Sequence, residues 1–472
     1  MLFPTATFAI FFVLVLPLSW LAMPHVHRWR PFMIAASYVF YSWWDWRFIV
    51  LLAGCTVWNQ FLAVRIHRSP SPAQRKRLLV TALAGNLLVL GYFKYYDFFV
   101  SSTQNAAAAV GLDLPLSVKT IVLPVGISFY TFMAISYVVD TYRGDFKPTT
   151  LEKFAAYLSF FPHLVAGPIV RPSELIPQID SPRSPRRVDT SRAFYLIATG
   201  LFKKVVIANY LASSIVDDVF AAPGNHSSLE ILIGVYAYAV QIYADFSGYT
   251  DIAIGIALLL GFTFPQNFDS PYAATSLQDF WRRWHMTLSR WLRDYVYIPL
   301  GGNRRGRILT FRNVMLTMLL GGLWHGAAWT FVVWGGLHGV GLAAERWWRG
   351  RPGYVPRGRS VLRTWTARLV TFHVVCLGWI FFRADSFDLA REMIAGLFTG
   401  WGEASTLVTG GVLLAIAVGI GSQYLPARVP QLIMARFSRL PVLGQAAVLA
   451  FALMFTHAMG PEGVAPFIYF QF

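Results

Sequence analysis

The sequence predicts an all-α protein that crosses a membrane several times. Of its 472 residues 56% are hydrophobic and 13% are charged, whereas a soluble domain carries about 25% charged residues. The mean hydropathy is +0.50. Several apolar runs reach the roughly 20 residues that span a bilayer core as a helix. Helices satisfy their own backbone hydrogen bonds, and no alternating barrel pattern is visible, so about 10–12 transmembrane helices are expected.

The apolar runs are spread along the whole chain, and no long polar insert separates them. They cover 5–22, 32–44, 47–64, 78–97, 119–139, 194–217, 230–261, 362–382, 408–425 and 442–458. We therefore expect one membrane domain over 1–472. Within it, N-terminal helices occupy 1–145, a central part with His285 and His325 occupies 146–345, and C-terminal helices occupy 346–472.

The formal charge of +17 is concentrated in short loops between the apolar runs. Basic residues cluster at 65–77, 183–187, 304–312 and 346–363. This distribution follows the positive-inside rule, places these loops in the cytoplasm and argues against nucleic acid as a partner. The first apolar run lacks a basic start and is followed by Arg28 and Arg30, so it is expected to be uncleaved, with the N-terminus outside.

Two stretches differ from plain membrane spans. Proline and glycine interrupt 151–172, and 263–312 is rich in aromatic residues and arginine, so both are expected to be re-entrant or interfacial. The second stretch also predicts one helix with a continuous apolar stripe, formed by Trp281, Trp284, Leu288, Trp291 and Tyr295. The uncharged run 313–343 is long for one span, and basic loops at both ends favour a hairpin that turns near Gly321, Gly322 and His325.

Polar residues at membrane depth are the candidate functional residues, because they are costly there and usually mark function. His325 lies in the middle of GGLWHGA, where the glycines let another group approach the imidazole. His285, in RRWHMTL, either takes part in function or faces lipid headgroups. His338 is expected to have a structural role, and His163, beside Pro162, could line a cavity.

Asp245 and Asp251 are six residues apart and so do not share one helical face. We expect them to orient neighbouring groups or to bind arginines. The sequence contains no nucleophile elbow, no phosphate-binding loop and no metal-ligand motif, and its two cysteines lie in apolar runs. A histidine in a narrow, glycine-lined interior suits general-base activation of a hydroxyl, which fits acyl transfer without a metal.

Several long blocks of the sequence resemble the bacterial membrane-bound O-acyltransferases, most of all the alginate O-acetyltransferase branch. The resemblance covers essentially the whole chain, and its blocks are 123–145, 160–172, 243–262, 279–306 and 316–339, with further matches at 37–46, 91–99 and 467–472. It implies a tunnel through a bundle of helices. It also implies that His325 is the catalytic base and that His285 is the second histidine of the site.

The resemblance implies transfer of acetyl from a cytoplasmic donor, acetyl-CoA, to an extracytoplasmic polysaccharide such as alginate, with no permanently bound cofactor. The protein would then reside in the bacterial inner membrane. Arg282 and Arg283 are candidates for binding the donor phosphates, and Trp324 for lining the tunnel. His285 could orient His325, bind the thioester or relay a proton.

Other acceptors and partners fit the same family. The acceptor could be peptidoglycan, cellulose or a teichoic acid. The acyl group could also pass to a periplasmic SGNH-type acetyltransferase, and the protein could belong to a polysaccharide synthesis or export complex. A transporter or lipid flippase would also carry histidines inside a membrane bundle, but the chain shows no clear repeat. Thioester cleavage would distinguish the enzyme from the transporter.

Overall fold

The computed structural model describes residues 1–117, 121–352, 360–426 and 428–459. In these ranges the regular secondary structure is helical, as predicted, and contains no strand. The matching block at 467–472 and part of the basic loop at 346–363 lie outside the described residues. The chain forms two compact units, one made of Met1–Asp189 and Ile256–Pro265 and the other of Thr190–Gly255 and Gln266–Phe472. The expected three-part division of a single domain stays a prediction.

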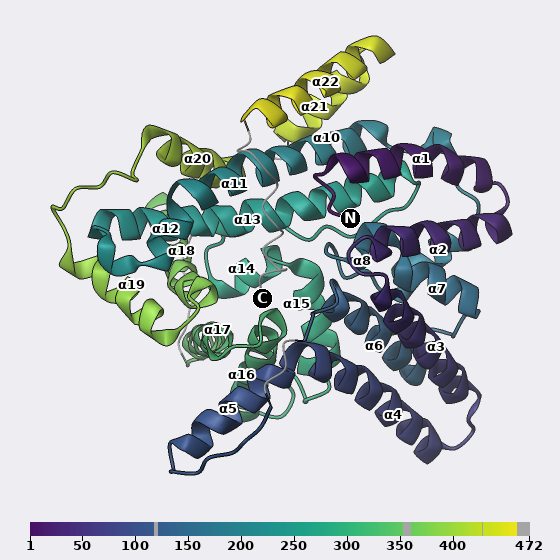
Figure 1. Ribbon diagram of the computed structural model, residues 1–472, viewed down its shortest axis with the longest axis horizontal. Helices are drawn as coiled ribbons and strands as arrows, with labels where there is room; N and C mark the ends of the chain where they lie inside the picture. The colour runs from purple at the N-terminus through teal and green to yellow at the C-terminus, as the bar shows by residue number, and fades with distance from the viewer. Residues whose placement is uncertain (118–120, 353–359, 427, 460–472) are drawn as a thin grey trace. The chain divides into compact units, whose positions relative to one another are not determined.

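The described residues of the first unit form nine α-helices, and α4 continues into α5 through a π-helical turn at Gly91–Tyr95. They are α1 (Ala6–Ala22), α2 (Val26–Ser42), α3 (Arg47–Arg68), α4 (Pro72–Leu90), α5 (Tyr96–Ala108), α6 (Ile127–Arg143), α7 (Leu151–Ser159), α8 (Phe161–Leu164) and α9 (Pro172–Ile179). Helix α6 is the core of this unit, because nearly all its side chains are buried and it packs on both α3 and α4 (Figure 1).

The second unit holds both candidate histidines, His285 and His325. Its α-helices are α10 (Thr190–Leu201), α11 (Asn209–Leu211), α12 (Asp217–Ala221), α13 (Ser228–Leu259, which ends in the first unit), α14 (Leu277–Arg283), α15 (Met286–Leu292), α16 (Arg307–His325), α17 (Trp329–Arg349), α18 (Val361–Arg383), α19 (Phe387–Thr399), α20 (Gly410–Gly421), α21 (Arg428–Ser438) and α22 (Val442–Met459). Two π-helical segments join α10, α11 and α12 into one continuous helix.

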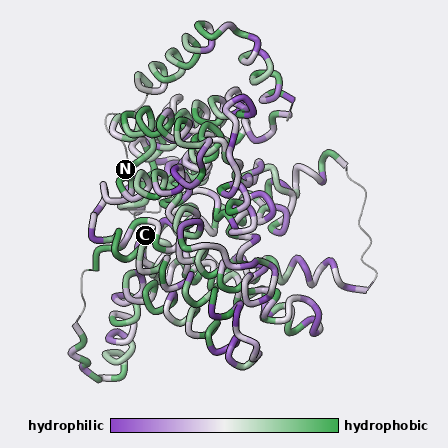
Figure 2. Tube along the Cα trace, turned by 90° about the vertical axis from the view of Figure 1, so that its right-hand side faces the viewer, coloured by the Kyte–Doolittle hydropathy of each residue, from purple (hydrophilic) through white to green (hydrophobic). Residues whose placement is uncertain are grey.

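Five described helical segments are long and apolar enough to cross a membrane, and six if the bent pair α20 and α21 counts as one span. The five are Arg47–Arg68, Pro72–Ala108, Thr190–Ala221, Ser228–Leu259 and Val361–Arg383. Helices α1 and α22 are apolar but contribute shorter stretches. The other helices of the expected 10–12 are shorter or more polar than a simple span, and Figure 2 shows hydrophilic residues interspersed among the hydrophobic ones along the chain.

Candidate functional site

The uncharged run 313–343 folds as a helical hairpin, which was the favoured expectation. Helix α16 ends at His325 and α17 begins at Trp329, so the turn lies directly after the histidine. The two helices meet backbone to backbone: a methyl group on Gly322 would overlap the carbonyl oxygen of Phe331, and one on Gly335 would overlap that of Met318. These glycines therefore fix the position of His325 relative to α17.

His325 is buried, with 1% of its surface exposed, among aromatic rings. Its ring centroid lies 5.0 Å from both Trp324 and Trp334 and 5.3 Å from Phe382, with each pair of rings close to perpendicular. The His285 ring lies 6.3 Å away, centroid to centroid. The structure thus brings together the two histidines that the sequence singled out, 40 residues apart in the chain.

His285 interrupts the helix that was expected from the aromatic stripe, and that expectation was wrong. Helix α14 ends at Arg283 and α15 begins at Met286, and between them His285 has a left-handed backbone with a φ of +40°. A non-glycine residue in the left-handed region of backbone conformation is strained and needs support from neighbouring groups. Of the residues of the expected stripe, Trp281 lies on α14, Leu288 and Trp291 lie on α15, Trp284 lies at the break and Tyr295 lies in the π-helical turn Arg293–Tyr297.

Asn267 provides that support. Its backbone oxygen accepts from Met286 N at 2.9 Å, and its side-chain Oδ1 accepts from the backbone N–H of Thr287 at 3.1 Å. Oδ1 also lies 3.2 Å from Nδ1 of His285. Because this oxygen only accepts hydrogen bonds, Nδ1 must donate, so in the neutral ring the lone pair lies on Nε2.

His285 is neutral at physiological pH, because burial lowers its pKa to about 3. No described protein group hydrogen-bonds to Nε2. The ring is held from the opposite side by Phe246 on α13, edge-on at 4.7 Å between centroids. His285 can therefore accept a proton or a hydrogen bond through Nε2, but it cannot donate one there in its neutral form.

A cavity of about 790 Å³ lies next to these histidines. Its walls come from α14, α15, α16, α17 and the π-helical turn Arg293–Tyr297. Met286, which follows His285 directly, lines it, and so does Met318, about two turns before His325 on α16. The cavity therefore approaches the histidine pair, although neither imidazole is among its lining residues.

The cavity is strongly basic. Glu345 is the one carboxylate among its lining residues, against five arginines, namely Arg282, Arg290, Arg293, Arg346 and Arg349. Glu345 forms an ion pair with Arg349, and Arg293 pairs with Asp294. Arg346 donates a hydrogen bond to the Tyr297 hydroxyl at 2.7 Å. Several guanidinium groups in one cavity are suited to an anion with more than one phosphate.

The three residues predicted to contact the donor lie in different places. Arg282 lines the cavity and has no carboxylate partner among the described residues. Arg283 does not line it, because its guanidinium bonds to Asp279 at 2.9 Å and to the Asp269 carbonyl at 3.3 Å. Trp324 is buried beside His325 and outside the cavity wall. Arg290 and Arg293 were overlooked because sequence spacing alone did not show which face of the broken helix meets the hairpin.

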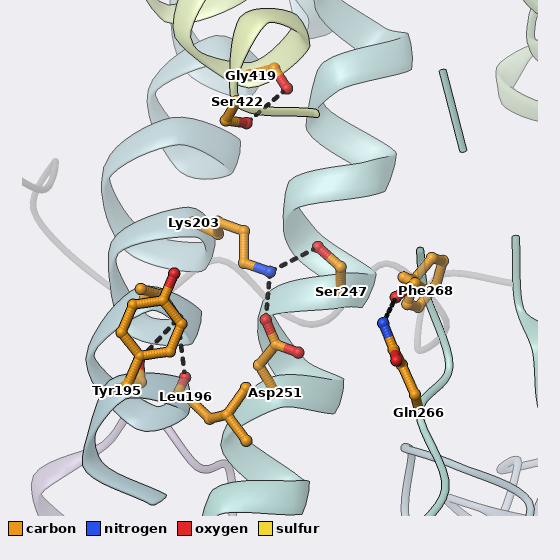
Figure 3. A network of polar contacts seen from close by, with 10 residues as sticks. Tyr195, Leu196, Lys203, Ser247, Asp251, Gln266, Phe268, Gly419 and Ser422 are labelled. Atoms are coloured by element: carbon orange, nitrogen blue, oxygen red, sulfur yellow. Dashed lines mark hydrogen bonds and ion pairs between the residues drawn. The ribbon is translucent and has the colours of Figure 1, made fainter. Parts of the chain in front are cut away.

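The two aspartates of α13 each form an ion pair with a lysine. Asp245 pairs with Lys204, and Asp251 pairs with Lys203, which also donates to the Ser247 hydroxyl at 3.0 Å (Figure 3). The first pair is almost fully buried, whereas the side chains of the second are 22–23% exposed. These ion pairs join the π-helical segment Phe202–Ala208 to α13, the helix that also supports His285.

His163 has a packing role in the first unit. Its Nε2 donates to the carbonyl oxygen of Tyr157 at 2.9 Å, and its ring stacks on Phe264. Asn267, by contrast, is a site residue that the sequence analysis missed. The signal was weak, since only its position in the irregular stretch before His285 set it apart from other polar loop residues.

The all-helical, largely apolar fold agrees with a family comparison. Residues 5–381 match MBOAT, the membrane-bound O-acyltransferase family. The chain belongs to this family and is a multi-pass membrane O-acyltransferase.

Its relatives include bacterial acetylating enzymes. The chain is 44% identical over 375 residues to the probable alginate O-acetylase AlgI of Pseudomonas syringae pv. tomato, covering 78% of this chain and 69% of that protein. It is 45% identical over 373 residues to the protein of the same name from Azotobacter vinelandii, covering 78% and 72%. It is 37% identical over 392 residues to the peptidoglycan O-acetyltransferase of Helicobacter pylori, covering 77% and 73%.

Proposed function

We propose that this protein transfers acetyl from acetyl-CoA to a hydroxyl group of an extracytoplasmic polysaccharide, with alginate as the first candidate acceptor. The observation that carries the proposal is the basic cavity that approaches the pair His285 and His325. The names of the relatives favour acetyl as the acyl group and alginate as the acceptor.

Two observations support acetyl-CoA as the donor: the charge of the cavity and its position near a cytoplasmic loop. Acetyl-CoA carries several phosphates, which the cavity arginines can bind. Arg346 and Arg349 lie in the last turn of α17, next to the basic loop that the positive-inside rule assigns to the cytoplasm. The phosphates would stay at this end, while the narrow pantetheine arm extends towards His325.

In the proposed reaction His325 removes the proton of the acceptor hydroxyl as its oxygen attacks the thioester carbonyl. The new C–O bond forms, the C–S bond breaks, and the CoA thiolate leaves and takes up the proton from His325. His285 offers only a lone pair at Nε2, so its role is to accept a hydrogen bond from the acceptor hydroxyl or to relay its proton. It does not stabilise the thioester oxyanion in its neutral form.

The test uses purified protein in proteoliposomes with radiolabelled acetyl-CoA outside and an alginate oligosaccharide inside. We expect His325→Ala to lower kcat by about 10²–10⁴-fold, the usual contribution of a positioned general base. His373→Ala is the matched control, because that histidine is exposed on α18 and bonds to Tyr236. A folded His325→Ala protein that transfers acetyl at the wild-type rate would refute the assignment.

Peptidoglycan is the second candidate acceptor, because one relative is named for it. The same vesicles loaded with peptidoglycan fragments in place of alginate oligosaccharide compare the two directly. Transfer to neither glycan, together with transfer to an added periplasmic SGNH-type acetyltransferase, would identify a relay protein as the immediate acceptor.

A further inference from the structure

A third histidine, His338, lies near the site on α17. It is buried, with 2% of its surface exposed, and its ring centroid lies 5.0 Å from that of Trp334. Trp334 is also 5.0 Å from His325, so its indole lies in contact with both histidines. The sequence analysis favoured a structural role for His338, but its hydrogen bonding connects it to the basic cavity.

The partner of His338 is Trp281, a lining residue of that cavity. The indole Nε1–H of Trp281 lies 3.3 Å from Nδ1 of His338. An indole nitrogen only donates, so Nδ1 carries the lone pair and Nε2 carries the proton in the neutral ring. His338 thus has the opposite tautomer to His285. The indole of Trp281 can only donate a hydrogen bond to His338, and the side-chain oxygen of Asn267 can only accept one from His285.

Trp281 belongs to the cavity wall and also contacts the aromatic rings around His325. One side of it lines the cavity, and its ring lies 5.7 Å from that of Trp334, which in turn contacts His325. The Trp281 indole therefore links the cavity wall to the Trp334 ring that packs on His325. His338 holds the Trp281 ring through its hydrogen bond, and the orientation of that ring shapes this part of the cavity wall.

The other edge of His338 faces α18. A Cβ atom added to Gly378 would lie 3.1 Å from Nε2 of His338, so the glycine leaves just enough room for the ring. Nε2 has no hydrogen-bond partner among the described residues. Three helices, α14, α17 and α18, therefore fix the imidazole: one through a hydrogen bond, one through the chain and one through close packing.

We propose that His338 is a positioning residue that holds Trp281 in the wall of the donor cavity and so contributes to binding of the donor. This inference rests on the proposed function in taking that cavity as the donor site. His338 does not relay protons, because its Nδ1 is occupied by Trp281, its Nε2 faces Gly378, and the Trp334 ring separates it from His325.

The test measures initial acetyl-transfer rates against acetyl-CoA concentration for three variants. His338→Leu removes the acceptor and Trp281→Phe removes the donor, so each is expected to raise the KM for acetyl-CoA about tenfold, the effect of one lost hydrogen bond, with kcat within about twofold. His338→Gln keeps an acceptor oxygen and is expected to restore most of the affinity. The double variant Trp281→Phe/His338→Leu should be no worse than either single change, because both remove the same bond.

Gly378→Ala gives a second route if His338→Leu fails to fold. It leaves every polar group in place but pushes the His338 ring, so it should raise KM by a smaller factor. A loss of kcat at unchanged KM, a shifted pH profile in His338→Gln, or fully additive effects in the double variant would each overturn the proposal.

Arg282→Ala separates failure of this inference from failure of the proposed function. If Arg282→Ala raises the KM and His338→Leu does not, the donor cavity stands and the role of His338 is refuted. If neither variant changes the KM for acetyl-CoA, the donor does not bind in this cavity and both proposals fail. Arg391→Ala, an exposed arginine on α19 whose side chain is 83% accessible, is the control for general charge effects.

Discussion

The side-chain oxygen of Asn267 lies 3.2 Å from Nδ1 of His285 and at the same time caps the backbone N–H of Thr287. One amide group therefore fixes both the strained turn and the proton of the imidazole. This relationship makes Asn267 the residue on which the chemistry of His285 depends most directly.

Replacing Asn267 should disturb activity in two distinguishable ways. Asn267→Ala leaves buried donors without an acceptor, which costs about 1–3 kcal/mol and should lower kcat at least tenfold. Asn267→Asp keeps the acceptor but adds a negative charge, which raises the pKa of His285, so kcat should fall as pH decreases. Steady-state kinetics between pH 5 and 8 measure both effects.

The neighbouring Gln266→Ala is the control for Asn267, because that amide bonds to the Phe268 carbonyl and not to His285. Its kcat should stay within about twofold of wild type, as expected for a surface change away from the site. Equal losses in Gln266→Ala and Asn267→Ala would show that the loop matters only as a whole.

The glycines of the hairpin should tolerate no side chain where the backbones touch. Gly322→Ala is expected to lower the free energy of unfolding by about 1–3 kcal/mol through overpacking, and to reduce activity by moving His325. Gly336→Ala is the matched change, because there an added Cβ would meet only Leu319 Cδ2 at an ordinary 3.7 Å. Thermal unfolding in detergent distinguishes them, and equal melting temperatures would contradict the packing argument.

The two ion pairs of α13 should differ in importance. Lys204→Met removes one partner of an almost fully buried pair, which costs about 3–5 kcal/mol, whereas Lys203→Met removes a partner from a pair that water partly reaches. The double variant Lys204→Met/Asp245→Leu should recover most of the stability, because both charges of the pair are then removed. If Lys203→Met is the more damaging change, the burial of the pairs does not govern their contribution.

Acid should destabilise the protein through its buried histidines. Burial lowers the pKa of His285 to about 3 and that of His163 to about 4, and both lie outside the helices long enough to span a membrane. The unfolded chain binds their protons near pH 6.5. Stability is therefore full above pH 6.5 and falls as the pH decreases, by about 2 kcal/mol per histidine at pH 5.

His163→Phe tests this dependence, because phenylalanine can stack on Phe264 and carries no proton. The melting temperature of the variant should fall less than that of wild type between pH 7 and pH 5. The same slope in both proteins would mean that His163 does not contribute to acid unfolding.

The sequence predicted the parts of the fold that depend on composition and on local pattern. All-helical structure, the hairpin at 313–343 and the burial of His325 follow from hydropathy, charge and glycine placement. The break at His285 did not follow, because helical spacing continues through it and only the distant Asn267 explains the left-handed turn. The partners of Asp245 and Asp251 and the arginines of the cavity likewise depend on which helix faces meet, which a single sequence does not show.

The contact between α16 and α17 is made by backbone at Gly322 and Gly335, so no side chain there can be exchanged to shift His325 gradually. Evolution or protein engineering can therefore alter donor and acceptor choice only through the residues that surround this hairpin. Among enzymes that share such a contact, new substrates should arise from changed cavity walls and loops, while the hairpin and its histidine keep their positions.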